Sequence, residues 1–201
     1  MLLKSNSSPS MKRIALFGGS FDPVHRGHLL VAQAAFEELA LDRVIFIPAA
    51  QSPFKPDHPL APSTLRLAML RMALAGRTYA EVDTMEIDRG GISYTIDTIR
   101  SLHERFPNAE LHYLIGADHV PHLPKWREAE ELARLVEFVV IPRPGEPLVP
   151  VPSPFRSRQL RGFPLGVSAS QIRDRCRARR DITHLTPSTV AEFIRTNHLY
   201  L

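Results

Sequence analysis

Short apolar segments alternate along this chain with longer segments of helical periodicity. The apolar segments scarcely alternate with polar residues, as in Val44-Ile45-Phe46-Ile47, which is typical of strands covered on both faces. The longer segments repeat apolar residues every three or four positions, as Leu29, Ala32, Phe36 and Leu39 do. This order predicts an α/β fold, namely a doubly wound parallel sheet with helices on both faces and a small helical segment at the C-terminus.

The same pattern gives approximate bounds for each element. We expect strands at Arg13–Phe17, Arg43–Ile47, Ala80–Ile87, Leu111–Ile115 and Val136–Ile141, and helices at Gly27–Leu39, Ser63–Leu74, Thr95–Arg105, Arg127–Arg134, Ser170–Arg177 and Pro187–Thr196. Prolines gather at 48–62 and 142–164, so neither stretch can be regular throughout. The first stretch follows the second strand, at the edge where open α/β sheets bind ligands.

The length of 201 residues, 44% of them hydrophobic, is sufficient for one sizeable core. We expect a disordered leader at 1–11 and a single domain at 12–201, whose C-terminal helical part covers about 167–201; the true start is either Met1 or Met11. No apolar run is long enough for a secretory signal or a membrane span. The single cysteine, Cys176, excludes an internal disulfide and fits a reducing compartment. A cytoplasmic protein without a membrane partner is therefore expected.

The charge balance is mildly basic, with 25 Lys and Arg against 21 Asp and Glu and a net charge of +4. A small positive excess suits anionic substrates, whereas nucleic-acid binding usually needs a clustered basic face. Because the C-terminal helix is basic, a nucleic-acid-binding module stays open as an alternative to an enzyme. The oligomeric state, monomer or homodimer, is not determined by the sequence.

The segment 18–28, Gly-Gly-Ser-Phe-Asp-Pro-Val-His-Arg-Gly-His, lies between the first strand and the first helix. Gly18 and Gly19 let backbone N–H groups approach an oxyanion, and the helix that opens near Gly27 points its unpaired N–H groups into the same space. His25 and His28 are three residues apart and project to one side, where both can donate to one phosphate. A plain turn explains the glycines but not the histidines, and a metal site lacks a third ligand at recognisable spacing.

A second segment, Val167-Ser168-Ala169-Ser170-Gln171-Ile172-Arg173, opens a C-terminal helix. Ser168 or Ser170 can cap this helix, and the guanidinium of Arg173 can bind a phosphate in bidentate fashion. A serine cap followed by arginine is, on its own, more often structural. Beside the glycine-rich segment, it indicates a second phosphate-binding element.

Two further segments, 93–98 and 116–126, fall at the predicted ligand edge of the sheet. The only tryptophan, Trp126, follows Pro124 and Lys125. A lone Trp is often part of the core, but in a loop at this edge it can stack on a flat ring. Both interpretations of Trp126 stay open at this point.

These segments together resemble a known family. His25-Arg26-Gly27-His28 and Ser168 to Arg173 resemble the two phosphate-binding elements of the nucleotidyltransferase superfamily, which has a Rossmann-like fold. Ser93-Tyr94-Thr95, the segment from Gly116 to Trp126 and the ending at 185–200 resemble the bacterial nicotinate mononucleotide adenylyltransferases. The resemblance covers nearly the whole chain after Met11.

The resemblance implies adenylyl transfer from ATP to nicotinate mononucleotide, giving nicotinate adenine dinucleotide and pyrophosphate, with Mg²⁺ bound mainly through the ATP phosphates and no protein residue assigned as a metal ligand. It implies catalytic roles for His25, His28, Lys55 and Arg173. It implies ATP contacts for Gly18, Gly19, Ser20, Phe21, His25, His28, Gly116, Asp118, Ser168, Ser170 and Arg173. It implies nicotinate mononucleotide contacts for Lys55, Tyr94, Thr95 and Trp126.

The chain departs from the family pattern at three positions. Ala169 replaces a hydroxyl residue, Phe54 stands where His is frequent, and Arg179 occupies the usual place of a glycine, so we expect a different helix ending there. Nicotinamide mononucleotide and phosphopantetheine stay open as alternative acceptors. The choice between nicotinate and nicotinamide depends on donor geometry around Thr95 and Trp126.

Overall fold

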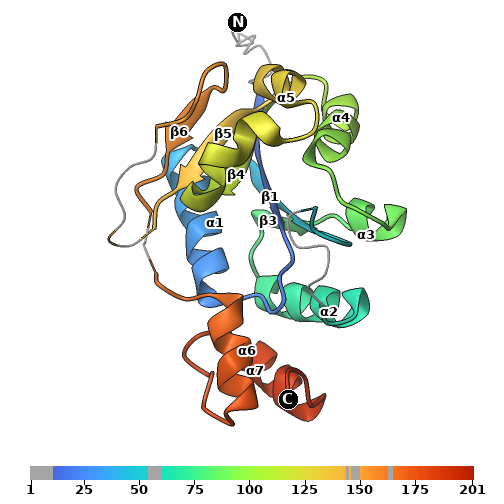
Figure 1. Cartoon of the computed structure of the whole chain (residues 1–201), viewed down its shortest axis with the longest axis vertical. Coiled ribbons are helices and arrows are strands. Elements are labelled where there is room, and N and C mark those ends of the chain that lie inside the picture. Colours follow the sequence, from blue (N-terminus) through green and yellow to red (C-terminus); the bar gives the residue numbers. More distant parts are fainter. Residues whose placement is uncertain (1–10, 54–59, 144, 146–149, 163–164) are drawn as a thin grey trace, which may run out of the picture.

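The structure is a computed structural model that describes residues 11–53, 60–143, 145, 150–162 and 165–201. Most of the predicted leader, and Phe54 and Lys55 in the first proline-rich stretch, lie outside the described residues. A six-stranded, wholly parallel sheet forms the centre, in the order β3-β2-β1-β4-β5-β6. This confirms the predicted α/β fold with a doubly wound parallel sheet (Figure 1).

Four of the strands, β1, β2, β4 and β5, lie near the positions that the apolar runs predict. The strands are β1 (Lys12–Gly19), β2 (Arg43–Pro48), β3 (Ala80–Val82), β4 (Ala109–Gly116), β5 (Glu137–Ile141) and β6 (Ser157–Gln159). The helices are α1 (Arg26–Glu38), α2 (Ser63–Leu74), α3 (Met85–Arg89), α4 (Thr95–Arg105), α5 (Ala129–Leu135), α6 (Ala169–Arg177) and α7 (Ser188–Thr196), with a 3₁₀ helix, η1, at Ala117–Lys125. None of the helices among the described residues is long and apolar enough to cross a membrane.

The strand predicted at Ala80–Ile87 is wrong beyond its first three residues. Only Ala80–Val82 pairs with β2, and α3 begins at Met85. The carboxylate of Asp83 accepts the backbone N–H of Met85 at 3.0 Å, a local turn that directs the chain into a helix. The polar sequence after Val82 therefore favours a turn over a longer edge strand.

Two other elements were not predicted. The segment expected as a loop around Pro124 belongs to η1, which contains Pro121 as well. The second proline-rich stretch contains β6, a three-residue edge strand whose side chains are all exposed. Since β6 buries no apolar face, it leaves no hydrophobic pattern in the sequence.

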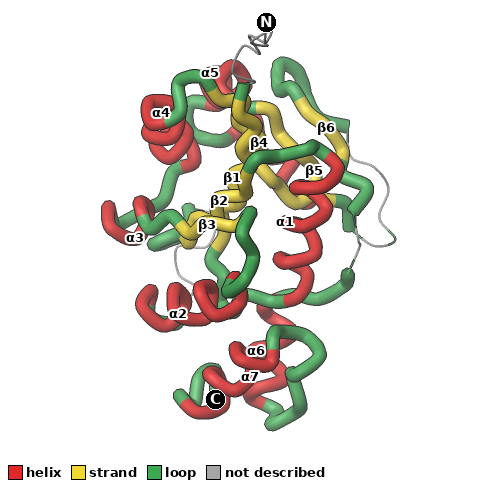
Figure 2. Tube along the Cα trace, turned by 180° about the vertical axis from the view of Figure 1, so that it is seen from behind, coloured by secondary structure: helices red, strands yellow, loops and turns green. Residues whose placement is uncertain are grey.

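Apolar side chains fill both faces of the sheet. One cluster joins Phe17, Phe46 and Val139 to α1, α2, α6 and α7, and the other joins Leu16 and Phe138 to α4, η1 and α5. Figure 2 shows α1 lying along the sheet and α6 with α7 gathered at one end of the molecule. This arrangement brings the start of α6 to the carboxyl edge of the central strands.

Helix α6 ends in the geometry that the family glycine would favour, although the residue is arginine. Arg179 adopts a left-handed φ of 51°, and the N–H of Arg180 donates to the carbonyl of Arg175 at 2.8 Å. This is the Schellman ending of a helix, for which glycine is the least strained residue. The different ending expected from the sequence is thus wrong, and Arg179 takes the left-handed conformation itself.

Candidate active site

A pocket of about 440 Å³ opens at the carboxyl edge of β1, β4 and β5. Twelve of the fifteen residues proposed from the sequence line it: Gly18, Gly19, Ser20, His25, His28, Thr95, Gly116, Asp118, Trp126, Ser168, Ser170 and Arg173. Phe21 and Tyr94 are not among the lining residues, and Lys55 lies outside the described part of the chain. The two predicted phosphate-binding elements, the segments 18–28 and 167–173, are far apart in sequence but line the same cavity.

The two histidines form the start of α1. His25 is the N-cap rather than a helical residue, and the rings of His25 and His28 stack with centroids 3.7 Å apart and planes 19° apart. The backbone N–H of His25 donates to Nδ1 of His28 at 3.1 Å, and the N–H of His28 donates to Nδ1 of His25 at 3.4 Å. Because both Nδ1 atoms accept, a neutral ring carries its proton on Nε2.

The environment keeps both rings neutral. Burial, followed by the charge of Arg143, lowers the pKa of His25 to about 4. Burial, followed by the neighbouring His25, lowers the pKa of His28 well below 6.5. Near neutral pH the pair therefore presents two Nε2–H donors without a net charge, which suits phosphate oxygens whose charge is neutralised elsewhere.

The start of α6 forms the second side of the pocket. Ser168 is its N-cap: the hydroxyl accepts the N–H of Gln171 at 3.2 Å, and the Gln171 side chain accepts the N–H of Ser168 at 3.0 Å. The guanidinium of Arg173 donates to the hydroxyl of Ser170 at 3.2 Å and to the carbonyl of Asp22 at 2.7 Å. Arg173 is thus held between its own helix and the glycine-rich loop.

A third group of polar residues lies at the end of β4. Oδ1 of Asp118 is 3.0 Å from the guanidinium of Arg143. Burial alone would raise the pKa of Asp118, but the hydrogen bond and charge of Arg143 hold it below its ordinary value. A Cβ on Gly116 would lie only 2.4 Å from Oδ1 of Asp118, so glycine is required for this carboxylate position.

The remaining wall is formed by Glu86 of α3, Thr95 at the start of α4, Tyr113 of β4 and Trp126, which directly follows η1. Trp126 packs edge-on against Tyr113 and Phe138, with centroids 6.1 and 6.2 Å away, and also lines the pocket. It is therefore both part of the core boundary and a wall of the cavity. Burial and the charge of nearby Glu86 raise the pKa of Tyr113 to about 12, so its hydroxyl stays protonated.

Six lining residues with polar side chains are not among the fifteen site residues proposed from the sequence. They are Ser52, Glu86, Ser93, Tyr113, His119 and Arg143, of which only Ser93 and His119 fall within the candidate site segments 93–98 and 116–126. Glu86 is buried and accepts from Thr98 at 2.6 Å, and burial raises its pKa. Arg143 lies two residues after the end of β5, so its position just beyond a predicted strand was the one available signal for this ligand edge.

Comparisons with known proteins agree on one family. The model of the cytidylyltransferase-like family matches residues 16–175. A probable nicotinate-nucleotide adenylyltransferase of Opitutus terrae is 42% identical over 191 residues, covering 94% of this chain and 97% of its own length. The nicotinate-nucleotide adenylyltransferase of Bacillus subtilis is 36% identical over 190 residues, covering 94% and 99%.

A solved structure shows the same fold at low sequence identity. The nicotinic acid mononucleotide adenylyltransferase of Plasmodium falciparum, complexed with NaAD, superposes with a TM-score of 0.78 at 19% identity, covering 94% of this chain and 97% of that one. A structure from Vibrio parahaemolyticus, described as a putative nicotinate-nucleotide adenylyltransferase, gives a TM-score of 0.68 at 21% identity, covering 94% and 96%.

Proposed function

Because the chain belongs to the cytidylyltransferase-like family and, within it, to the nicotinate-nucleotide adenylyltransferases, we propose that its pocket transfers the adenylyl group of ATP to nicotinate mononucleotide. The products are nicotinate adenine dinucleotide and pyrophosphate, and the reaction is a step of NAD biosynthesis. The observation that carries the proposal is that His25, His28 and Arg173 line one cavity.

The chemistry fits the residues that the pocket offers. The attacking phosphate oxygen of the acceptor is already ionised, so no general base is required. His25 and His28 bind the α- and β-phosphates through their Nε2–H groups, while Arg173 binds the leaving pyrophosphate. The family resemblance assigns Lys55, which lies outside the described residues, to the same leaving group. Alignment of the two substrates and neutralisation of charge on the departing group supply the rate enhancement.

The remaining residues divide between the two nucleotides. The backbone of Gly18, Gly19 and Ser20 approaches the ATP phosphates, and Gly116 with Asp118 contacts the adenosine ribose. On the opposite side, Thr95 and the amides near Tyr94 receive the pyridine carboxylate, and Trp126 stacks on the pyridine ring. Nicotinamide mononucleotide is the second candidate acceptor, because it differs only by an amide in place of that carboxylate.

The donor set fits a magnesium ion held mainly by substrate. Among the described residues, no group of three possible metal ligands lies in the pocket. Its two carboxylates are engaged, Glu86 with Thr98 and Asp118 with Arg143. Mg²⁺ keeps several waters and needs few protein ligands, so it can enter on the ATP phosphates and neutralise part of their charge.

The test is pyrophosphate release from ATP with each acceptor in turn. We expect the highest kcat/KM with nicotinate mononucleotide, compared with nicotinamide mononucleotide and phosphopantetheine. His28→Ala should lower kcat by about a hundredfold, the cost of one preorganised donor. His103→Ala, an exposed histidine outside the pocket, is the matched control. Release that is faster with another acceptor, or unchanged in His28→Ala, would contradict the proposal.

A further inference from the structure

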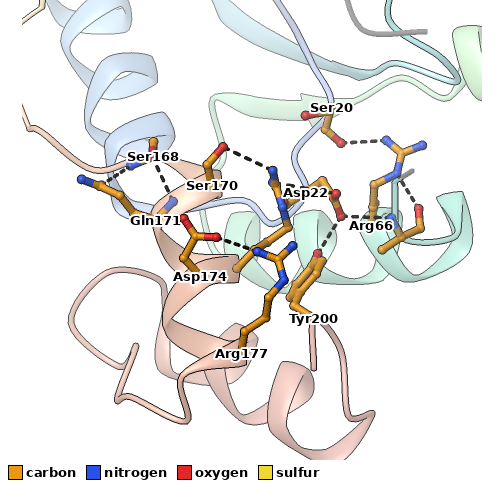
Figure 3. Close-up of polar contacts among 11 residues, drawn as sticks. Ser20, Asp22, Arg66, Ser168, Ser170, Gln171, Asp174, Arg177 and Tyr200 are labelled. Carbon is orange, nitrogen blue, oxygen red and sulfur yellow. Dashed lines mark hydrogen bonds and ion pairs between the residues drawn. The ribbon is translucent and has the colours of Figure 1, made fainter. Parts of the chain in front are cut away.

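The buried carboxylate of Asp22, in the glycine-rich segment 18–28, lies close to both Arg173 and Tyr200. Asp22 is 1% exposed, and its Oδ1 accepts the hydroxyl of Tyr200 at 2.7 Å and the N–H of Ala61 at 3.3 Å (Figure 3). Its other oxygen, Oδ2, accepts no hydrogen bond within the described part of the chain and lies 4.0 Å from the guanidinium of Arg173. The carboxylate thus connects Tyr200 to Arg173, the residue proposed to bind the leaving pyrophosphate.

Burial makes this carboxylate depend on its partners. An ionised group that leaves water is costly unless donors and an opposite charge replace its hydration. Burial and the neighbouring Asp22 charge raise the pKa of Tyr200, so the phenol stays protonated and donates. With Oδ1 fixed by that donor, Oδ2 is the oxygen turned toward Arg173.

The same loop is tied to the C-terminal segment at two further points. The hydroxyl of Thr186 donates to the carbonyl of Val24 at 2.8 Å, and the N–H of Arg26 donates to the carbonyl of Leu185 at 2.9 Å. The hydrogen bond from Thr186 is fully buried. Together with the Tyr200–Asp22 hydrogen bond, the C-terminal segment 185–200 thus forms three hydrogen bonds with residues 22–26, the segment that contains His25.

A second arginine, Arg66 of α2, contacts the backbone of the glycine-rich loop. Arg66 is 2% exposed and does not line the pocket. Its guanidinium donates to the carbonyls of Ser20 at 2.7 Å, Ala61 at 3.0 Å and Ala50 at 3.5 Å. Figure 3 shows Arg66 and Tyr200 on two sides of Asp22. The loop is thereby held on the side of α2 as well.

We propose that Tyr200 is a positioning residue: by fixing the carboxylate of Asp22, it holds the guanidinium of Arg173 in place beside the glycine-rich loop. The proposal rests on the proposed function, because Arg173 matters only if it binds the leaving pyrophosphate. It extends the active site to a side chain that does not line the pocket. The terminal residues of the chain then affect the rate without touching substrate.

The first test is Tyr200→Phe, which removes one hydroxyl and keeps the ring. We expect kcat for pyrophosphate release to fall about tenfold, the effect of one hydrogen bond to a charged group. The KM for nicotinate mononucleotide should stay within about twofold, because the pyridine wall is untouched. Tyr79→Phe is the matched control, since Tyr79 is partly buried, stacks on Phe36 and does not line the pocket.

A double-mutant cycle separates positioning from a general loss of structure. In an Arg173→Ala background, Tyr200→Phe should lower kcat no further, because the group it positions is gone. An equal loss in both backgrounds would overturn the proposal, as would a wild-type kcat in Tyr200→Phe. If Tyr200→Phe does not fold, Asp22→Asn takes its place in the same cycle.

The proposed function and the positioning role can fail separately. A wild-type protein that binds ATP but releases no pyrophosphate with any acceptor would contradict the proposed function. The role of Tyr200 would then be judged by ATP affinity, measured by calorimetry without acceptor. Tyr200→Phe should weaken that affinity and Tyr79→Phe should not; equal affinities in both variants would refute the role.

Discussion

Acidification should destabilise this fold in part because His25 is buried as a neutral ring. The perturbation that isolates this effect is His25→Asn. Asparagine is a favoured N-cap, and its Oδ1 can accept the N–H of His28 as Nδ1 of His25 does. The variant therefore keeps the helix start and removes only the titrating group and its Nε2–H donor.

The size of the effect follows from the pKa of His25, about 4 in the folded chain against the ordinary 6.5. Between these values the unfolded chain binds a proton that the folded chain does not, so the free energy of unfolding rises with pH in this window. This stability is fully present above pH 6.5 and is lost as pH falls toward 4. At pH 5 the loss amounts to about 2 kcal/mol from this one ring.

The assay is urea unfolding of both proteins at intervals from pH 8 to pH 5. The free energy of unfolding of the wild type should fall by about 2 kcal/mol more than that of His25→Asn over this range. Titrating groups remote from His25 are common to both proteins and cancel in the comparison. His28 does not cancel, because His25 lowers its pKa in the wild type, and this contribution adds to the difference in the same direction. Parallel curves would show that His25 is not buried as a neutral ring in the folded protein, and the account of the histidine pair would be refuted.

Two further substitutions test the walls of the pocket. Trp126→Ala should raise the KM for the pyridine mononucleotide about tenfold or more and leave the KM for ATP nearly unchanged, as steady-state kinetics would show; equal weakening of both would indicate a core role alone. Gly18→Ala places a Cβ 2.6 Å from the Tyr113 hydroxyl and should cost about 1–3 kcal/mol in urea unfolding. Gly166→Ala meets no atom of the described residues within 4 Å and is its control, so equal stability of the two variants would contradict this packing.

The central sheet was predictable because its signal is local. The strands β1, β2 and β5 each contain a continuous apolar run, the run in β4 is interrupted only by His112, and α2 and α4 have the bounds that periodicity predicts. Burial on both faces forces such runs, so few other interpretations fit them. The failures at β3 and β6 occur at the sheet edges, where Glu81 and Arg158 are exposed and the pattern weakens.

The two predicted phosphate-binding elements, the segments 18–28 and 167–173, were predictable for a similar reason. Each carries its geometry within a few residues: His25 and His28 form a reciprocal cap, and Ser168 with Gln171 forms another. Arg143 and Tyr113 have no such local pattern. They enter the pocket because β4 lies beside β1 and β5 lies beside β4, a neighbour relation that depends on strand order rather than on spacing along the chain.

Asp22 shows how far a local pattern extends. The sequence analysis assigned no role to Asp22, and its burial at 1% exposure is a finding of the structure. A buried carboxylate requires donors or an opposite charge, and these come from Ala61, Tyr200 and Arg173 only when α2, α6 and the C-terminal segment pack around the loop. The local motif therefore predicts the phosphate-binding residues, whereas the tertiary fold determines which remote residues support them.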